Sequence, residues 1–259
     1  METRARSRRS EGPFHHSTDP DTIDVCGRLV VERYLSDGWI VPENIDERTG
    51  CLTVEFDPCV PHSEYFLIAD PVSGEPQATG RYITVPIGAR GDAQRLPVEA
   101  DFELFSATRE RIGAARILDP GSVVEVSGLA RKLGAEASMQ RLYRAMWHHA
   151  IRAGYRVLLM RVEAAFVELA FANFGRVFEP AGPEVASYLR RGRIVPMLFE
   201  PATFLHAMTS HMRGLRELHG DLVADQYRQV IDFFLDGLED HEIALLAAPD
   251  IPQAVRPRF

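Results

Sequence analysis

The stretch Val123-Val124-Glu125-Val126-Ser127-Gly128-Leu129-Ala130 decides the fold, because its run of β-branched and apolar residues is typical of a buried strand. A polar loop, 131–137, follows it. The next residues repeat apolar side chains at helical spacing, which predicts an amphipathic helix that Ser138 caps and Gly154 ends. A second apolar strand is predicted at 155–162. Because a helix that crosses between two strands of one sheet favours parallel pairing, we expect the two strands to be parallel neighbours.

Further elements extend this unit in both directions. In chain order, the sequence predicts a helix at 23–35, strands at 64–69 and 78–85, the strand-helix-strand unit above, a helix at 164–174, and a final strand pair at 177–181 and 193–199. The first two strands are joined by a turn and should form an antiparallel hairpin. The fold class is therefore α/β (α+β), with a mixed central sheet flanked by helices over residues 23–200.

The two ends of the chain differ from this core. Residues 1–22 hold four arginines and no apolar period, which predicts a disordered basic tail. After Pro201 the pattern becomes helical, so we expect a C-terminal helical extension over 201–259. Its clearest apolar stripe, in a helix expected at 221–239, consists of Val223, Tyr227, Val230, Ile231, Phe234 and Leu238. Burying each large group yields about 1.5–3 kcal/mol, so the stripe should cover the core or join two copies in a homo-oligomer.

Composition excludes several classes of protein. The 259 residues are 46% hydrophobic and carry a net charge of -8, which suits a globular domain and argues against a nucleic-acid partner. No apolar run approaches the ~18 residues that a membrane span needs, and the N-terminus lacks the apolar segment of a secretory signal. Three cysteines are an odd and sparse count that fits a reducing compartment. We therefore expect a cytoplasmic protein.

Glu125 is the strongest candidate for a catalytic group. A carboxylate on a buried strand costs several kcal/mol to desolvate, so it needs a compensating role or partner. Alternation places Glu125, Ser127 and Leu129 on one face of the strand, unless a β-bulge shifts the register. Arg81 could form an ion pair with Glu125, orient it, or anchor a carboxylate or lactone group of a substrate.

A group of cations follows the same strand. It consists of Arg131, Lys132, Arg141 and Arg144. These side chains at the start of a helix could bind phosphate or form a solvated face. His148 and His149 lie off the apolar stripe of that helix and are expected to be exposed. Cys51, Cys59 and His62 have irregular spacing that is not typical of a metal site, and we expect no metal.

The sequence also resembles a known family. Val123 to Arg131 is similar to the Glu-x-Ser-Arg-Leu-Ala segment of acyl-homoserine-lactone synthases and of the related N-acyl amino acid synthases, which belong to the GNAT superfamily of acyltransferases. Three further pieces occur in the family's order. Arg33-Tyr34 through Gly38-Trp39-Ile40 and Asp46 resembles the substrate-covering region, Gly80-Arg81 resembles a Gly-x-x-Arg-Leu motif, and Leu96-Pro97 with Phe102 resembles a Leu-Pro-x-x-x-x-Phe motif.

The resemblance implies a GNAT-like fold and a set of roles. Glu125 would take a proton from an attacking amine, with Arg81 beside it. Coenzyme A or phosphopantetheine, as a thioester co-substrate, would contact Ser127, Leu129, Arg131, Lys132, Arg141 and Arg144. The acceptor would contact Trp39, Asp46 and Arg81. The parallel strands would splay apart at their C-terminal ends to admit the thioester.

The implied function is N-acyl transfer from acyl-CoA or an acyl carrier protein to the amine of an amino acid or similar small metabolite. No metal is required for this chemistry. Two departures from the family stand out, since Gly128 replaces the arginine after the serine and Asp46 stands alone where the synthases have a pair. The sequence therefore leaves two alternatives open: a catalytically inactive GNAT-fold ligand sensor, and a protein whose C-terminal helices bind a partner.

Overall fold

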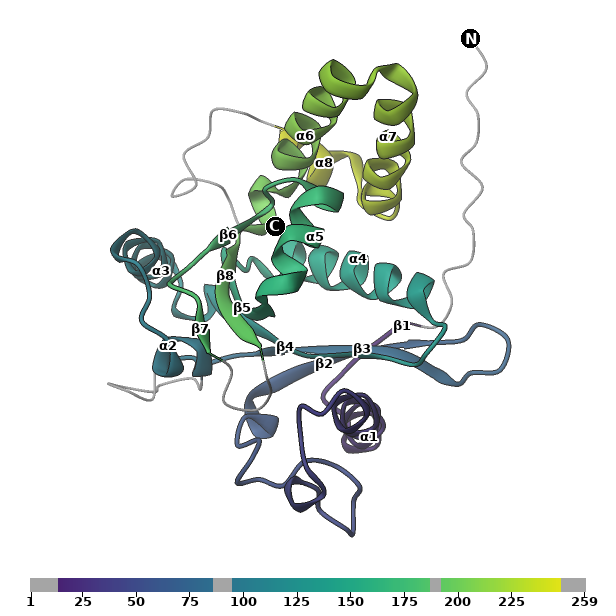
Figure 1. The fold of residues 1–259 in the computed structure, drawn as a ribbon, viewed down its shortest axis with the longest axis vertical. Coiled ribbons are helices and arrows are strands. Elements are labelled where there is room, and N and C mark those ends of the chain that lie inside the picture. Colours follow the sequence, from purple (N-terminus) through teal and green to yellow (C-terminus); the bar gives the residue numbers. More distant parts are fainter. Residues whose placement is uncertain (1–13, 86–94, 187–191, 248–259) are drawn as a thin grey trace.

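The computed structural model describes residues 14–85, 95–186 and 192–247 as a mixed sheet with helices on both faces (Figure 1). The strands are β1 (Phe14–Ser17), β2 (Ser63–Ala69), β3 (Pro76–Ile83), β4 (Val123–Arg131), β5 (Val157–Glu163), β6 (Phe178–Pro180), β7 (Val185–Ala186) and β8 (Arg193–Phe199). The α-helices are α1 (Pro20–Ser36), α2 (Pro97–Asp101), α3 (Ser106–Leu118), α4 (Glu136–Ala153), α5 (Ala164–Phe174), α6 (Phe204–His219), α7 (Asp221–Leu235) and α8 (Asp240–Ala247).

The sheet order is β1-β2-β3-β4-β5-β8-β6, and β7 also pairs with β8. β4 and β5 are parallel neighbours, as predicted, and they are joined through α4. The other pairings in the described chain are antiparallel, including the predicted β2–β3 hairpin and the β6–β8 pair. The prediction of a mixed α/β sheet is confirmed.

Element boundaries follow the local chemistry, with one correction in the central unit. Gly154 ends α4 in the left-handed conformation, at φ 74°, as predicted. Ser138 does not cap this helix, because α4 begins at Glu136 and Ala135 precedes it without a side-chain capping bond. The hydroxyl of Ser138 instead accepts a hydrogen bond from Arg141 within the first turns.

The prediction of a disordered tail is wrong for residues 14–22. β1 pairs antiparallel with β2, and α1 starts at Pro20 with Asp19 accepting a capping hydrogen bond from the Thr22 amide. A four-residue edge strand has too few side chains to show a period in the sequence, so only its partner strand reveals it. The arginine-rich part of the predicted tail lies outside the described residues.

Each face of the sheet has its own core. On one face, α4 and the C-terminal helices pack against a cluster that includes Phe66, Val124 and Leu158. On the other face, α2 and α3 cover a cluster that includes Val123, Leu159 and Leu198, while α1 covers the β2–β4 region. Figure 1 shows α1 and α4 on opposite sides of the strands. The alternation of β4 and β5 therefore sends odd-numbered residues 123, 125, 157 and 159 toward α2 and α3.

The C-terminal extension packs against the core. Tyr227, Ile231 and Phe234 of the predicted stripe are buried in the α4-side cluster, whereas Val223, Val230 and Leu238 are partly buried. The helix ends at Leu235, four residues earlier than expected. A homo-oligomer through these helices stays a prediction. Across the described residues, no helix combines the length and apolar character that crossing a membrane requires.

Candidate functional site

The candidate site begins where β4 and β5 part. Their parallel ladder runs from Val123–Val157 to Val126–Met160 and ends there. β4 continues to Arg131 paired with β3, and β5 continues to Glu163 paired with β8. The C-terminal halves of the two strands are therefore not paired with each other, which is the arrangement that the resemblance predicted.

A β-bulge lies in β4 at this point. Arg81 of β3 pairs with Ser127 and Thr79 pairs with Ala130, so two residues of β4, Gly128 and Leu129, oppose one residue of β3. Gly128 has φ 60°, a left-handed conformation that glycine adopts without the penalty of a Cβ atom. The replacement of the family arginine by glycine thus coincides with a backbone position that favours glycine.

The bulge corrects the predicted face of Leu129. Its side chain packs with the α4-side cluster, near Gly80 and Met146, and so lies across the sheet from Glu125. Strict alternation assigned Leu129 to the face of Glu125, and the extra residue at the bulge reverses that assignment.

Polar side chains form a row across four neighbouring strands on the α1–α2 face. Tyr65 of β2 pairs in register with Arg81 of β3, and Ile83, two residues along β3, pairs with Glu125 of β4. Glu125 is in register with Leu159 of β5, and Arg161 follows two residues later on the same face. Period-two alternation in adjacent strands therefore gathers the buried side chains of Tyr65, Arg81 and Glu125 and the partly exposed Arg161 into one polar region.

Glu125 is 1% exposed and both of its carboxylate oxygens have partners. Oε1 accepts hydrogen bonds from Nε and Nη2 of Arg161 at 3.0 and 2.8 Å, and Oε2 accepts one from the Val98 amide at 2.7 Å. Burial raises the pKa of Glu125, while Arg161 and the Val98 amide act to lower that pKa. Arg161 also pairs with Asp101 of α2 at 3.1 Å. The partner of Glu125 is thus Arg161 and not the anticipated Arg81.

Arg81 has a different carboxylate partner. Its guanidinium donates to both oxygens of Asp57, at 2.7 and 2.9 Å, and to the Tyr65 hydroxyl at 3.1 Å. Arg81 is buried, and Asp57 holds the pKa of its guanidinium above the usual value even though burial alone would lower it. Its buried Nε has no hydrogen-bond partner among the described residues. A bidentate pair of this kind fixes both side chains in position.

The side chains of Tyr34 and Cys59 lie near the charges of these ion pairs. Burial raises the pKa of the Tyr34 hydroxyl, and the nearby charges of Arg81 and Arg161 oppose that shift. Burial also raises the pKa of the Cys59 thiol, with Arg81, Asp57 and Glu125 as its charged neighbours. A thiol with a raised pKa is mostly protonated at neutral pH, which does not favour a nucleophilic role for Cys59.

Sequence reasoning missed Asp57 and Arg161. Arg161 carried a detectable signal, because a charged residue within the apolar run 155–162 raises the same question as Glu125 does in 123–130. Asp57 lies in a loop without periodicity, so only the fold brings it to Arg81.

The predicted acceptor residues occupy different places. Trp39 is partly buried against the cluster that contains Leu96 and Val98 of the α2 region. Oδ1 of Asp46 accepts hydrogen bonds from the amides of Arg48 and Thr49, so this carboxylate closes a local turn and Asp57, not Asp46, pairs with Arg81. The roles of Trp39 and Asp46 in binding a substrate stay predictions.

The predicted phosphate-binding cations also occupy different places. Arg131 pairs with Glu136 at 2.7 Å and Lys132 with Glu75 at 3.5 Å, next to the start of α4. Arg141 donates to Ser138 in the first turns of that helix. Arg144 instead points toward α7, where it donates to the Phe233 carbonyl and to Asp236 and lies 4.4 Å from the Phe233 ring centroid. The start of α4 therefore carries Arg131, Lys132 and Arg141. Arg144 instead contacts the C-terminal end of α7.

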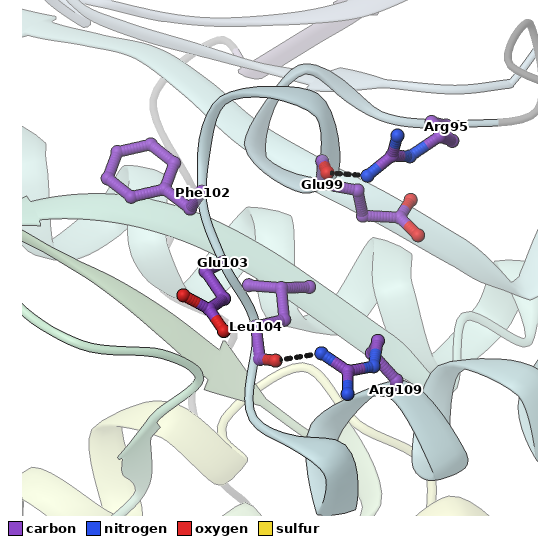
Figure 2. A pocket seen from close by; sticks show the side chains of 6 residues that line it. All are labelled: Arg95, Glu99, Phe102, Glu103, Leu104 and Arg109. Carbon is purple, nitrogen blue, oxygen red and sulfur yellow. Dashed lines mark hydrogen bonds between the residues drawn. The ribbon is translucent and has the colours of Figure 1, made fainter.

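A pocket of about 270 Å³ lies between α2 and the start of α3 (Figure 2). Its lining residues are Arg95, Glu99, Phe102, Glu103, Leu104 and Arg109. Figure 2 shows Arg95 and Arg109 donating to the backbone carbonyls of Glu99 and Leu104. Because Glu125 and Arg161 do not line this pocket, it is separate from the polar row.

Comparison with known proteins supports the fold assignment. Neither a protein-family model nor a curated protein sequence matches the chain. Among solved structures, FeeM, an N-acyl amino acid synthase from uncultured soil microbes, has a TM-score of 0.54 at 14% identity, covering 75% of this chain and 93% of that chain. The acyl-homoserine-lactone synthase LasI has a TM-score of 0.50 at 13% identity, covering 74% and 92%. The chain therefore has a GNAT-like fold and is structurally similar to acyltransferases of both kinds.

Proposed function

We propose that the protein is an N-acyltransferase that moves an acyl group from a thioester of coenzyme A or an acyl carrier protein to the amine of an amino acid or similar small metabolite. One observation carries this proposal: the buried, ion-paired Glu125 lies on β4 three residues before the bulge at Gly128 and next to the point where β4 and β5 stop pairing. That geometry offers unpaired strand edges beside a candidate proton acceptor.

The donor would lie along the separated strand edges. Backbone amides between Ser127 and Leu129 can donate hydrogen bonds to the developing oxyanion on the thioester carbonyl, since oriented N–H groups stabilise such charge. The start of α4, with Arg131, Lys132 and Arg141, can receive the phosphates of the carrier. The ion pairs that these cations make with Glu136 and Glu75 are partly exposed, and such pairs contribute only ~0–1 kcal/mol. A phosphate group can therefore compete for the cations.

Acyl transfer proceeds by attack of the neutral amine nitrogen on the thioester carbonyl carbon. A C–N bond forms, the carbonyl oxygen gains negative charge, and the amine proton passes to a base. The C–S bond then breaks and the thiolate leaves, taking a proton to become the free thiol. The reaction needs neither oxidant nor reductant.

Glu125 is the proposed base, directly or through a water molecule. A raised pKa brings a carboxylate closer to the pH at which it accepts protons most usefully. Because Arg161 and the Val98 amide occupy Glu125 in this structure, proton transfer requires a substrate or water to approach the carboxylate beside Arg161, whose side chain is 27% exposed. Arg161 would also attract the carboxylate of an amino-acid acceptor.

A thiol-release assay tests the proposal directly. The native chain is mixed with acyl-CoA of several chain lengths, or with an acyl carrier protein, together with a panel of amino acids and other amines. Acceptor-dependent thiol release and an N-acyl product detected by mass spectrometry are the expected result. Release that is the same without any acceptor would indicate hydrolysis and would contradict the proposed transfer.

A second candidate is a ligand sensor without catalysis. The full engagement of both Glu125 oxygens favours it, because a carboxylate held by three donors can serve as a rigid support. Thioester binding by calorimetry, together with the absence of thiol release with every acceptor tried, would favour the sensor over the enzyme.

A further inference from the structure

A second polar cluster lies across the sheet from Glu125, on the face that α4 covers. Glu64 and Phe66 of β2 share this face by alternation, and His16 of β1 is in register with Phe66. The ring centroid of His149, near the end of α4, lies 4.2 Å from that of His16, with the two rings tilted by 40°. Three segments that are far apart in sequence therefore bring two imidazoles and one carboxylate together.

The distances within this cluster suit a metal ion. Nε2 of His149 lies 2.9 Å from Oε2 of Glu64, Nε2 of His16 lies 3.5 Å from the same oxygen, and the three ligand atoms all lie within 4.8 Å of one another. In a tetrahedral zinc site, bonds of about 2.0–2.2 Å place neighbouring ligand atoms about 3.3–3.5 Å apart. Both histidine–carboxylate distances lie within about 0.5 Å of this spacing, and the 4.8 Å limit means that the two imidazole nitrogens need approach each other by at most about 1.5 Å to hold an ion.

The surroundings support a metal ligand role for Glu64. The Tyr155 hydroxyl donates to Oε1 of Glu64 at 2.7 Å, which leaves Oε2 directed at the two histidines. Hydrogen bonds from such outer groups orient ligand carboxylates in metal sites. The side chains of His16, Glu64 and His149 are 36%, 26% and 23% exposed, so an ion can enter from solvent.

We propose that His16, Glu64 and His149 bind one divalent transition-metal ion of the zinc class, which links the edge strand β1 to β2 and α4. Two imidazoles and one carboxylate suit zinc and related ions better than calcium or magnesium, which take oxygen ligands. This site goes beyond the proposed acyl transfer and lies on the opposite face of the sheet. The structure contradicts the expectation that His148 and His149 form an exposed pair, since His148 is buried against the Phe234 carbonyl and the His149 side chain is only 23% exposed.

Metal binding by untagged, metal-free protein tests this inference. Elemental analysis after zinc loading should give one ion per chain, and cobalt should give the visible absorption of a tetrahedral site without thiolate charge transfer. Zinc at about 100 times its dissociation constant should raise the melting temperature by about 5–10 °C. Affinity should fall in acid, because protons compete for imidazole.

Variants locate the site. His16→Gln, Glu64→Gln and His149→Gln should each weaken zinc binding by more than ~100-fold, and Tyr155→Phe by about 10–100-fold. His219→Gln, an exposed histidine in the last turn of α6, is the matched control and should bind zinc normally. Three ligand variants guard against one of them failing to fold, which circular dichroism checks. No uptake of zinc or cobalt at micromolar free metal, or unchanged affinity in the folded ligand variants, would overturn the proposal.

Discussion

Arg161 donates two hydrogen bonds to the same oxygen of Glu125, from the strand that runs parallel to it. The pairing arises because residue 161 is two positions beyond Leu159, the register partner of Glu125. The parallel register of β4 and β5 thus places the Arg161 guanidinium beside the buried Glu125 carboxylate, on the side where the two strands separate.

Glu125→Gln should keep the shape of this side chain but remove its capacity to accept a proton. If the carboxylate is the base, kcat should fall by ~10²–10⁴-fold. Affinity for the thioester should change little, since the proposed carrier contacts lie elsewhere. Steady-state thiol-release kinetics and calorimetry measure the two quantities, and a wild-type kcat would refute the base role.

The pH dependence of kcat tests whether Glu125 acts as the base and whether Arg161 tunes its pKa. The carboxylate accepts a proton only when ionised, so activity should decline as pH falls through the pKa of Glu125. Arg161 acts to lower that pKa, so Arg161→Gln should move the acidic limb of the kcat profile to higher pH. Arg213→Gln, at an exposed position of α6, should leave the profile unchanged. The same limb in both variants would mean that Glu125 does not titrate in the reaction.

Removing the partner of Arg81 should destabilise the fold. Asp57→Asn leaves a buried guanidinium without its counter-ion, at a cost of about 3–5 kcal/mol in the free energy of unfolding. The double variant Asp57→Asn with Arg81→Met should recover much of this loss. Asp37→Asn breaks the partly exposed pair with Arg33 and should cost at most ~1 kcal/mol. Urea denaturation provides the comparison, and an equal loss from both single variants would contradict the importance of burial.

Gly128 should resist substitution because of its backbone. Gly128→Ala places a Cβ atom at φ 60°, which costs about 1–2 kcal/mol, although the space there allows ordinary contacts with Arg81 and Val30. Gly128→Arg introduces the arginine found at the corresponding position of the synthases that the sequence resembles, and it should carry the same backbone penalty. Gly113→Ala in α3, where a Cβ atom meets nothing, should stabilise by ~0.5–1 kcal/mol. Thermal unfolding should show lower stability for Gly128→Ala and Gly128→Arg and higher stability for Gly113→Ala.

Substitutions of the cations near α4 should have two different effects, one on coenzyme A binding and one on stability. Arg131→Ala combined with Arg141→Ala should weaken coenzyme A binding, and the remaining affinity should depend less on salt. Arg144→Ala should instead lower stability, because it removes the contacts that hold α7. Calorimetry and thermal unfolding distinguish the two effects. Unchanged binding in the double variant would exclude this surface as the phosphate site.

The sequence by itself determined the order and type of the main elements, because period-two and helical patterns depend on local chemistry. It located β4, α4 and β5 within a few residues and singled out Glu125 from its charge in an apolar strand. It could not show β1, whose four residues are too few for a pattern, or the bulge at Gly128, which is defined by the pairing with β3.

Only the tertiary structure decided which charges meet. Arg161 reaches Glu125 through the register of parallel strands, and Asp57 reaches Arg81 from a loop that packs over the sheet. His16, Glu64 and His149 come together because β1, β2 and α4 share one edge of one face. These contacts join residues 24 to 133 positions apart in the chain, a separation at which local sequence patterns carry no information about pairing.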